Sequence, residues 1–426
     1  MRYKSSPARE VVLAMLINKS PQLTLAVLAL VLCSCHSRDK SFQNNQTSIT
    51  FEEVFRSCTA KKVDGLMGAC ADPDNMIRRI AVASLTEIAD KRAAEQLRKS
   101  LMDPDDFARE SAAHGLGVIK DTGAVATLKK MLDDPAAEVR NAAAWALAQT
   151  NQLEQAMVER LGPNRDPAKE AAVRLFNPVA QMRLVNEHDE GYSQHVLLSL
   201  SPTEPMVTEW VASRGRDPVV KELNTSLESE AALVTTRLIA AHSLVALRTN
   251  DVGPLLRVVK RSENWPVRLK CLAVLGALLN KNAVRPLIDL LKSSEDFKLK
   301  SHVANTLGHL GDKQAVAPLM DVLAGPEYVG TKIIRPSIFD YQGTVLWRKL
   351  KKDLQVSVVT ALGRLGDRRA ETILRVFADS AFREDTKKKR DPHKPADVID
   401  LAISTAPDAD EEVRKAASLA LTQPTK

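Results

Sequence analysis

The histidines of this sequence have the residue type for metal binding, but not the usual spacing. His302 and His309 are seven residues apart, and so are His188 and His195. A helix presents paired metal ligands most readily at positions i and i+4, as in HExxH, and that motif does not occur in the sequence. Walker loops, glycine-rich dinucleotide turns and GxSxG motifs are missing as well. The sequence therefore predicts no metal, no cofactor and no catalytic residue.

Two cysteines near the N-terminus are placed for lipid attachment. The first of them ends the apolar run LTLAVLALVLC, which Lys19 precedes, and the second follows two residues later. A membrane-spanning helix needs about 20 apolar residues, so this shorter run is typical of an export signal. The sequence Leu32-Cys33-Ser34-Cys35 resembles a lipobox, with an apolar residue three positions before Cys35 and a small one directly before it. We expect acylation at Cys35, with Cys33 as the second choice.

The rival interpretation of this segment is an ordinary cleaved leader, or an internal helix, with incidental cysteines. Either Met1 or Met15 could be the true start. A cysteine with several acyl chains attaches stably to a membrane. Because His36, and not Asp, follows Cys35, we expect an outer-membrane anchor that faces the periplasm. Residues 1–35 are then the signal and lipobox, and the polar residues 36–50 are a tether.

The net charge argues against nucleic acid as a partner. The chain has a formal charge of +7, but residues 1–34 hold +3 of it, so +4 remains after their removal. A charge of this size on an exported chain gives no nucleic-acid signature. The basic run Lys387-Lys388-Lys389-Arg390 is expected to be a solvated loop, with phosphate or anionic lipid as the alternative ligand.

Arginine recurs along the chain at a regular spacing. We interpret these residues as a structural ladder that ties each unit to its neighbour's loop carboxylates and helix C-termini; the alternative is a ladder for acidic groups of a partner. The members are Arg78, Arg109, Arg140, Arg237, Arg268 and Arg414.

One segment concentrates aromatic residues in a chain that is only 4% aromatic. Residues 325–352 hold Tyr328, Phe339, Tyr341 and Trp347, in runs of strand-like composition around a Gln-Gly pair. We expect a loop or hairpin insertion here. Aromatic side chains are favoured interface anchors, so these four residues are candidate partner-binding residues; the alternative is that they pack on the chain itself.

An internal repeat of about 31 residues predicts the secondary structure in which these residues lie. Several columns recur at this step, among them Pro73, Pro104 and Pro135, and Leu85, Leu116 and Leu147. Each unit has a first helix rich in Ala and Leu and a second helix. A short turn between them supplies an N-cap residue: Asp90, Asp121, Asn250, Asp312 or Asp367. A stack of about ten helical hairpins over residues 51–423 follows, which is an all-α solenoid.

The repeat pattern VRxxAAxALGxLGDxxAVxPLxxLL resembles the short type of HEAT-like repeat found in phycobilin lyases. It is clearest at 266–292, 299–323 and 354–377. The resemblance implies an α–α superhelix and says little about activity. We therefore expect a membrane-anchored lipoprotein scaffold that binds a protein partner of unknown identity and is not an enzyme. The alternative is an enzyme or enzyme subunit of the lyase-like class.

Overall fold

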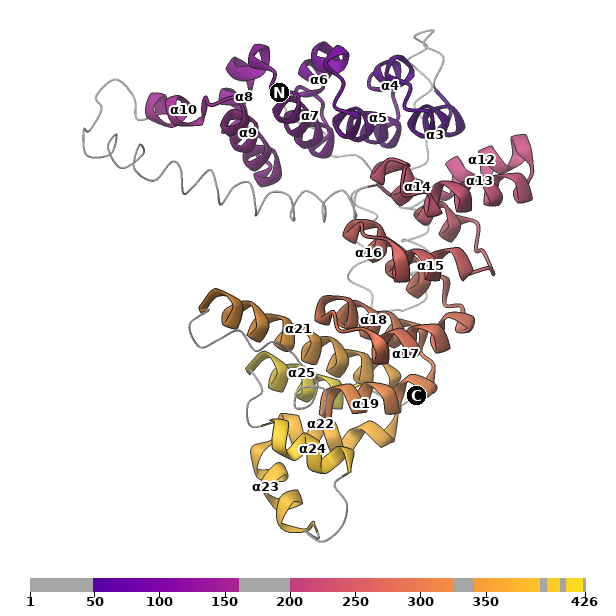
Figure 1. The fold of residues 1–426 in the computed structure, drawn as a ribbon, viewed down its shortest axis with the longest axis vertical. Coiled ribbons are helices and arrows are strands. Elements are labelled where there is room, and N and C mark those ends of the chain that lie inside the picture. Colours follow the sequence, from indigo (N-terminus) through magenta and orange to yellow (C-terminus); the bar gives the residue numbers. More distant parts are fainter. Residues whose placement is uncertain (1–48, 161–199, 325–340, 391–396, 407–410, 424–426) are drawn as a thin grey trace, which may run out of the picture. The chain divides into compact units, whose positions relative to one another are not determined.

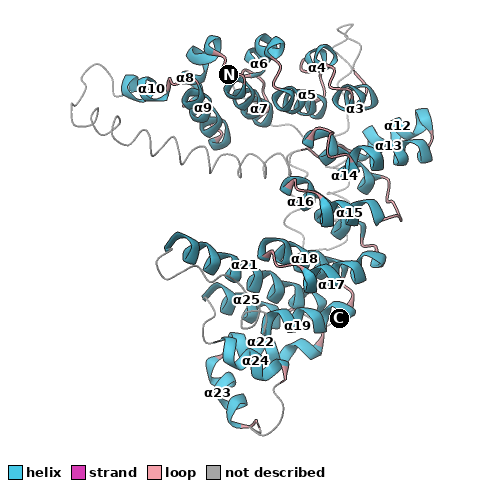
Figure 2. Cartoon of the chain, viewed as in Figure 1, coloured by secondary structure: helices cyan, strands magenta, loops and turns pink. Residues whose placement is uncertain are grey.

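The computed structural model describes residues 49–160, 200–324, 341–390, 397–406 and 411–423 (Figure 1). Every regular element in these ranges is a helix (Figure 2). All of them belong to one compact unit, Ile49–Lys426. The helices form successive hairpins in which each first helix packs on the first helix of the next hairpin. This confirms the all-α solenoid.

The first set of hairpins contains four pairs of helices. Two of the second helices begin with a short 3-10 turn, η1 (Lys91–Ala93) before α6 and η2 (Thr122–Ala124) before α8. The pairs are α3 (Phe51–Thr59) and α4 (Val63–Ala69), α5 (Asn75–Ile88) and α6 (Ala94–Ser100), α7 (Asp106–Val118) and α8 (Val125–Met131), and α9 (Ala137–Gln149) and α10 (Leu153–Arg160).

The second set follows residue 200 and continues the same arrangement. Its helices are α12 (Glu204–Arg214), α13 (Arg216–Glu228), α14 (Val234–Ala246), α15 (Gly253–Arg261), α16 (Trp265–Leu278), α17 (Val284–Ser293), α18 (Phe297–Leu310), α19 (Val316–Ala324), α21 (Tyr341–Leu365), α22 (Glu371–Ala378), α23 (Ser380–Lys388), α24 (Val398–Thr405) and α25 (Glu411–Leu421). The 3-10 turns η3 (Lys281–Ala283), η4 (Lys313–Ala315) and η5 (Arg368–Ala370) precede α17, α19 and α22.

The turn inside a hairpin is held by an acidic or amide side chain. Asp90, Asp312 and Asp367 each accept a hydrogen bond from the backbone N–H two residues later, at 2.8–2.9 Å. They cap the 3-10 turn that precedes the second helix, and not the α-helix itself. The predicted cap at Asn250 is wrong, because the side chain of Asp251 accepts from Gly253 N instead. Asp121 precedes η2 but makes no side-chain cap.

Small residues set the spacing between successive first helices. At three crossings a glycine lies against the backbone of an alanine in the next first helix, and a Cβ on the glycine would be 2.8–2.9 Å from the alanine Cα. The pairs are Gly117 with Ala146, Gly308 with Ala361, and Gly363 with Ala420. Backbones this close leave no room between the helices.

Threonine replaces one member of this pair at two crossings. Between α5 and α7, Thr86 faces Gly115 and donates to the carbonyl of Ser111 at 2.8 Å. Between α16 and α18, Thr306 faces Gly276 and donates to the carbonyl of Leu272 at 3.3 Å. In both cases the accepting carbonyl lies four residues before the glycine, so the two crossings share one bonding pattern.

The two sets of hairpins also contact each other out of sequence order. Helices α12 and α14 pack on α3, and α14 also packs on α5. The Trp210 ring lies 5.8 Å from the ring of Phe51 and 5.0 Å from that of Phe55. The beginning of the second set therefore covers the beginning of the first set.

The C-terminal part of the predicted insertion is helical. Residues 325–340 lie outside the described ranges, but 341–352 form the first three turns of α21 and not a strand or loop. The strand-like composition there was outweighed by a period of four: Leu346, Leu350 and Leu354 recur at helical spacing. Helix α21 is consequently 25 residues long, against 14 for α16 and 14 for α18.

Candidate functional site

The predicted acylation and partner-binding residues are only partly within the described ranges. Cys33, Cys35, Tyr328 and Phe339 lie outside them, as do His188 and His195. The backbones of Tyr341 and Trp347 lie in the first two turns of α21. The two positions are six residues apart, so they lie about 120° apart around the helix axis, since an α-helix has 3.6 residues per turn.

The arginine ladder has the same geometry in successive hairpins. Arg78 donates to both carboxylate oxygens of Asp103, in the loop that leads to the next hairpin, at 2.8 and 3.1 Å, and to the carbonyl of Asp72 at 2.9 Å. Arg109 makes the equivalent bonds to Asp134 at 2.9 and 3.0 Å and to the carbonyl of Asp103 at 2.8 Å. The hydrogen bonds that the two arginines donate to these carboxylates raise the pKa of both arginines. Each arginine thus joins two adjacent loops.

The other ladder arginines vary this contact. Arg140 donates to the carbonyls of Asp134 and Pro135 at 2.7 and 2.9 Å. Arg237 is buried, donates to both carboxylate oxygens of Glu230 at 2.6 Å and reaches Ser262 Oγ at 3.0 Å.

The last two members are less tightly engaged. Arg268 donates to the carbonyl of Val259 at 3.0 Å, and its guanidinium lies 4.0 Å from Asp296. Arg414 is exposed on α25. Five of the six arginines are therefore engaged within the chain, which leaves them poorly placed to receive acidic groups from a partner.

Two titratable side chains in α14 and α16 have strongly shifted pKa values. Burial lowers the pKa of Lys270 to about 8, and its ammonium donates to the carbonyl of Leu200 and to Ser201 Oγ, both at 3.1 Å. Burial, followed by repulsion from Lys270, lowers the pKa of His242 to about 4. Because the ammonium of Lys270 is held by groups of its own chain, we interpret the pair as structural.

The described cysteines are shielded from reaction. Cys58, Cys70 and Cys271 are buried free thiols, and burial raises the pKa of each to about 12. Thiols with such a pKa are poor nucleophiles at neutral pH. In the part of the chain that the structure describes, no three His, Cys, Asp or Glu side chains gather as a metal site requires.

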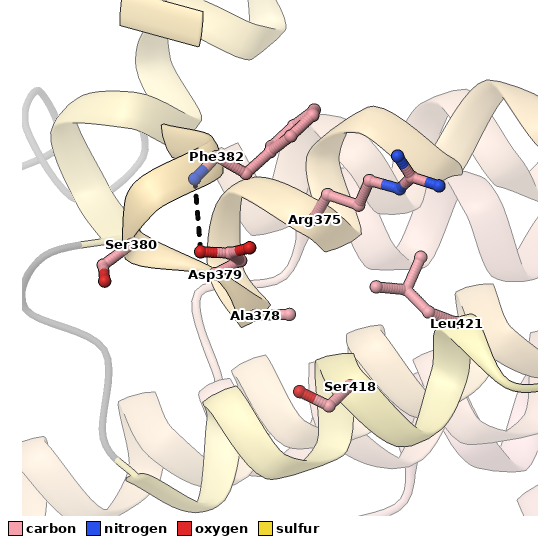
Figure 3. A pocket seen from close by; sticks show the side chains of 7 residues that line it. All are labelled: Arg375, Ala378, Asp379, Ser380, Phe382, Ser418 and Leu421. Atoms are coloured by element: carbon pink, nitrogen blue, oxygen red, sulfur yellow. Dashed lines mark hydrogen bonds between the residues drawn. The ribbon is translucent and has the colours of Figure 1, made fainter. Parts of the chain in front are cut away.

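A hollow of about 550 Å³ lies beside the last helices, between α25 and the junction of α22 with α23 (Figure 3). Its polar groups already have partners. Asp379 accepts from the N–H groups of Ala381 and Phe382 at 2.8 and 3.2 Å, which caps α23. Arg375 pairs with Glu371 at 2.7 Å and lies over the Phe382 ring. We interpret this hollow as a notch between helices.

A second hollow, of about 420 Å³, runs between α16 and α18, and we call it the α16–α18 groove. It is the more apolar of the two, and its lining includes small side chains from α16 and two histidines from α18. The lining residues are Leu269, Leu272, Ala273, Gly276, Ala277, His302, Asn305, Thr306 and His309.

The groove lies where α16 and α18 pack less closely than other first helices and carry side chains too small to fill the space between them. A Cβ on Gly276 would lie 3.8 Å from the methyl group of Thr306, which is ordinary van der Waals contact, and no backbone atom lies nearer. Two residues before the leucine that recurs in each first helix, α7 and α9 carry His114 and Trp145, whose rings stack 4.3 Å apart. The corresponding residues of α16 and α18 are Ala273 and Asn305.

The ionisable side chains of the groove and its nearest neighbours are mainly basic. Burial lowers the pKa of His302, whose ring meets the edge of the Trp265 ring at 5.8 Å. His309 Nδ1 lies 2.8 Å from the carbonyl of Asn305 and 3.5 Å from the guanidinium of Arg364.

Two more cations stand at the N-terminal ends of the same helices. Arg268 and Lys298 lie over the Trp265 ring, at 5.3 and 4.8 Å from the ring centre. The nearest carboxylate that contacts them is that of Asp296, 4.0 Å from Arg268. None of the nine lining residues carries a carboxylate.

Comparison with protein families gives the repeats a name. The profile of HEAT repeats matches residues 63–148 and 252–332, which together are less than half of the chain. Both segments are HEAT repeats. The first HEAT segment contains α4 to α9. The second contains α15 to α19, and so includes both helices of the α16–α18 groove.

Solved structures of two different enzymes are similar to this chain. Human deoxyhypusine hydroxylase in complex with glycerol is 19% identical, with 71% of this chain and 84% of that chain covered at a TM-score of 0.29. The complex of CpcE and CpcF of phycocyanin lyase from Nostoc sp. PCC7120 is 16% identical, with 75% and 99% covered at a TM-score of 0.22. At such TM-scores the likeness carries no argument about activity. No curated protein matches the chain by sequence.

The described helices do not include a membrane span. None of them combines the length and the apolar character needed to cross a bilayer.

The α16–α18 groove was not predicted from the sequence. A signal was present in the column of residues before the repeated Leu-Gly pair, where Ala361 of α21 corresponds to Thr306 of α18. A second signal was the column that holds Trp145 in one repeat and Ala273 in another. Both changes alter side-chain volume without disturbing the hydrophobic period, so a search for periodicity passes over them.

Proposed function

We propose that this chain is a lipid-anchored scaffold that binds a protein partner through its HEAT-repeat surface and performs no catalysis. The observation that carries the proposal is the extra length of α21. The Leu307-Gly308 pair of α18 corresponds to the Leu362-Gly363 pair of α21. When the two helices are aligned on these pairs, the first three turns of α21 extend beyond the N-terminal end of α18. These turns hold Tyr341 and Trp347.

A projecting helix with aromatic residues suits protein recognition. Packing within the array does not require the extra turns, because α16 and α18 complete their hairpins with 14 residues each. Aromatic residues supply much of the binding energy at protein interfaces. Because positions 341 and 347 lie about 120° apart around the helix axis, we expect a partner to bury one of them centrally and to meet the other at the rim.

The scaffold role is also supported by the use of the recurring charged side chains. Five ladder arginines bind loops and helix ends of their own chain, so the most regular chemical feature of the sequence serves assembly of the array. The membrane anchor rests on the lipobox-like residues that end at Cys35, with Cys33 as the second choice. An outer-membrane position facing the periplasm is part of the same proposal.

Site-specific photo-crosslinking tests the partner-binding surface. A benzophenone amino acid is placed at Tyr341 or at Trp347 in the full chain in its native membrane, and at Met102 as the control, which is 77% exposed on the first set of hairpins. We expect one discrete crosslinked species from 341 or 347 and none from 102. The same species from all three positions, or none from 341 and 347, contradicts the proposed surface.

The matching truncations separate binding from folding. Trp347→Ala and Tyr341→Ala are each expected to weaken capture of the crosslinked partner by about 2 kcal/mol if the residue is an anchor. A residue packed on its own chain would instead lower the free energy of unfolding by about 3–5 kcal/mol. Thermal melts run beside the capture assay distinguish the two outcomes, and instability with intact capture rules the surface out.

A further inference from the structure

The α16–α18 groove combines an apolar interior with basic surroundings. Ala273, Gly276 and Ala277 leave space on the α16 side. On the α18 side, His302 and His309 line the groove. Its volume of about 420 Å³ lies within the range of roughly 300–1,000 Å³ typical of ligand pockets.

The cations around the groove are positioned to act on a bound group. Arg364 of α21 reaches His309 from one end. Lys298 lies over the Trp265 ring at the other end, beside His302. Among the described residues, Asp296 brings a negative charge to this end, where it lies 4.0 Å from Arg268 and its charge also acts on His302. With Arg268 offset by Asp296, Lys298 and Arg364 remain as the cations of the groove. The field along the groove therefore favours carboxylates over ammonium groups.

We propose that the α16–α18 groove is a docking site for a segment of the protein partner that carries leucine-like side chains and flanking carboxylates. The apolar side chain fills the space over Ala273 and Ala277, and the carboxylates meet the basic residues at the two ends. This inference rests on the proposed function, because it names the chemistry of the partner, but it uses a surface different from the start of α21.

Matched peptides test the charge preference. Three short fluorescent peptides share the same leucine spacing and carry Glu, Gln or Lys at all other positions, and fluorescence anisotropy with the purified full chain in detergent measures their binding. We expect a Kd below roughly 100 µM for the Glu peptide and at least about tenfold weaker binding of the Lys peptide. Equal binding of all three, or preference for Lys, overturns the proposed occupant.

A pair of register-matched variants tests the location. Ala277→Glu puts a carboxylate at an exposed position of the groove, while Val118→Glu puts one at the corresponding exposed position of α7. We expect Ala277→Glu to weaken binding of the Glu peptide by at least about tenfold and Val118→Glu to leave it unchanged. Equal effects of the two variants overturn the groove as the site. Circular dichroism melts confirm that both variants fold; if Ala277→Glu does not, Ala277→Gln and Ala273→Leu take its place.

Two further outcomes separate this inference from the proposed function. Glu-peptide binding that Ala277→Glu abolishes, without any crosslinked partner at 341 or 347, supports the groove and contradicts the α21 surface. A crosslinked partner whose capture Ala277→Glu leaves intact, with no peptide binding, supports the scaffold and overturns the groove. Concentration-dependent dimers that Ala277→Glu dissolves would assign the groove to a second copy of the chain and also overturn the acidic segment.

Discussion

The carboxylate of Glu87, near the end of α5, accepts a hydrogen bond of 3.0 Å from the backbone N–H of Thr235, 148 residues later in the chain. Its other oxygen accepts from the N–H of Val234, the first residue of α14. Helix α14 has no side-chain cap from its own N-cap residue, Leu233. A residue of the first set of hairpins therefore supplies the N-terminal cap of a helix in the second set.

Glu87→Ala is expected to lower the free energy of unfolding by about 1 kcal/mol, the usual cost of removing a helix N-cap. The loss arises because two N–H groups of α14 lose their acceptor and the positive end of the helix dipole loses a nearby charge. Urea titration followed by circular dichroism measures it. Glu95→Ala, which removes an exposed carboxylate of α6 paired only with Lys99, is the control and should leave the midpoint unchanged.

Gly308→Ala is expected to destabilise the fold, whereas Gly276→Ala is expected to leave its stability unchanged or to raise it slightly. The two glycines nevertheless occupy the same position in their helices, directly after the repeated leucine. A Cβ at Gly308 meets the Cα of Ala361 at 2.8 Å, so we expect a loss of about 1–3 kcal/mol in stability from overpacking. A Cβ at Gly276 has its nearest neighbour at 3.6 Å, and alanine is favoured over glycine in a helix by about 0.5–1 kcal/mol. Equal melting temperatures for the two variants would contradict the packing scheme.

Acid should weaken the arginine ladder over a defined range of pH. Burial raises the pKa of the Asp134 carboxyl, but the hydrogen bonds from Arg109 and from the backbone N–H of Ala136, together with the charges of Arg109 and Arg140, outweigh burial and leave the pKa lowered. A carboxyl with a lowered pKa in the folded chain stabilises the fold above its unfolded pKa of about 3.9 and loses that contribution as the pH falls further.

Asp134→Asn removes the stabilising contribution of the ionised carboxylate. We expect it to lower the free energy of unfolding by about 1–3 kcal/mol at pH 7, because it weakens the charge-assisted bonds to Arg109. The difference between the variant and the parent should shrink as the pH falls below about 4. Denaturation curves at pH 7, 5 and 3 check this, and a difference that stays constant down to pH 3 would show that the carboxylate charge is not responsible.

Cys35→Ala is expected to release the chain from membranes into the soluble fraction, because a single acylated cysteine is proposed to carry the anchor. Metabolic labelling with a fatty acid gives the readout. The Cys33→Ala variant is the control, since it removes a thiol two residues away. Label that persists in the double variant would show that neither cysteine is the acylated residue.

Repetition made much of this fold predictable. Columns such as Pro73, Pro104 and Pro135 indicated the hairpins and their loops, and the recurrence of Arg78 and Arg109 indicated a role between neighbours that their contacts with Asp103 and Asp134 now describe. These features depend on residues about 31 positions apart, so each copy reports on the others.

Features that occur once were less accessible. Glu87 and Thr235 meet by tertiary packing, and neither residue belongs to a repeated column that could have indicated the contact. The sequence predicted a loop or hairpin for the turns before residue 352, because their β-branched and aromatic residues outweighed the four-residue spacing of the leucines. For the α16–α18 groove, the decisive changes were the volumes of two side chains, Thr306 and Ala273, within an intact hydrophobic pattern.

The contact of α12 and α14 with α3 and α5 has a mechanical consequence. Ile49 lies two residues before the start of α3, and its backbone N–H donates a hydrogen bond of 2.8 Å to the side chain of Asp72. A force applied to the chain at Ile49 acts where the two sets of hairpins meet. The Phe51–Trp210 aromatic contact and the bonds of Glu87 to α14 therefore both bear this force. A linear stack held at its first hairpin would pass the whole load through one helix pair at a time, whereas this junction distributes it over two branches in parallel.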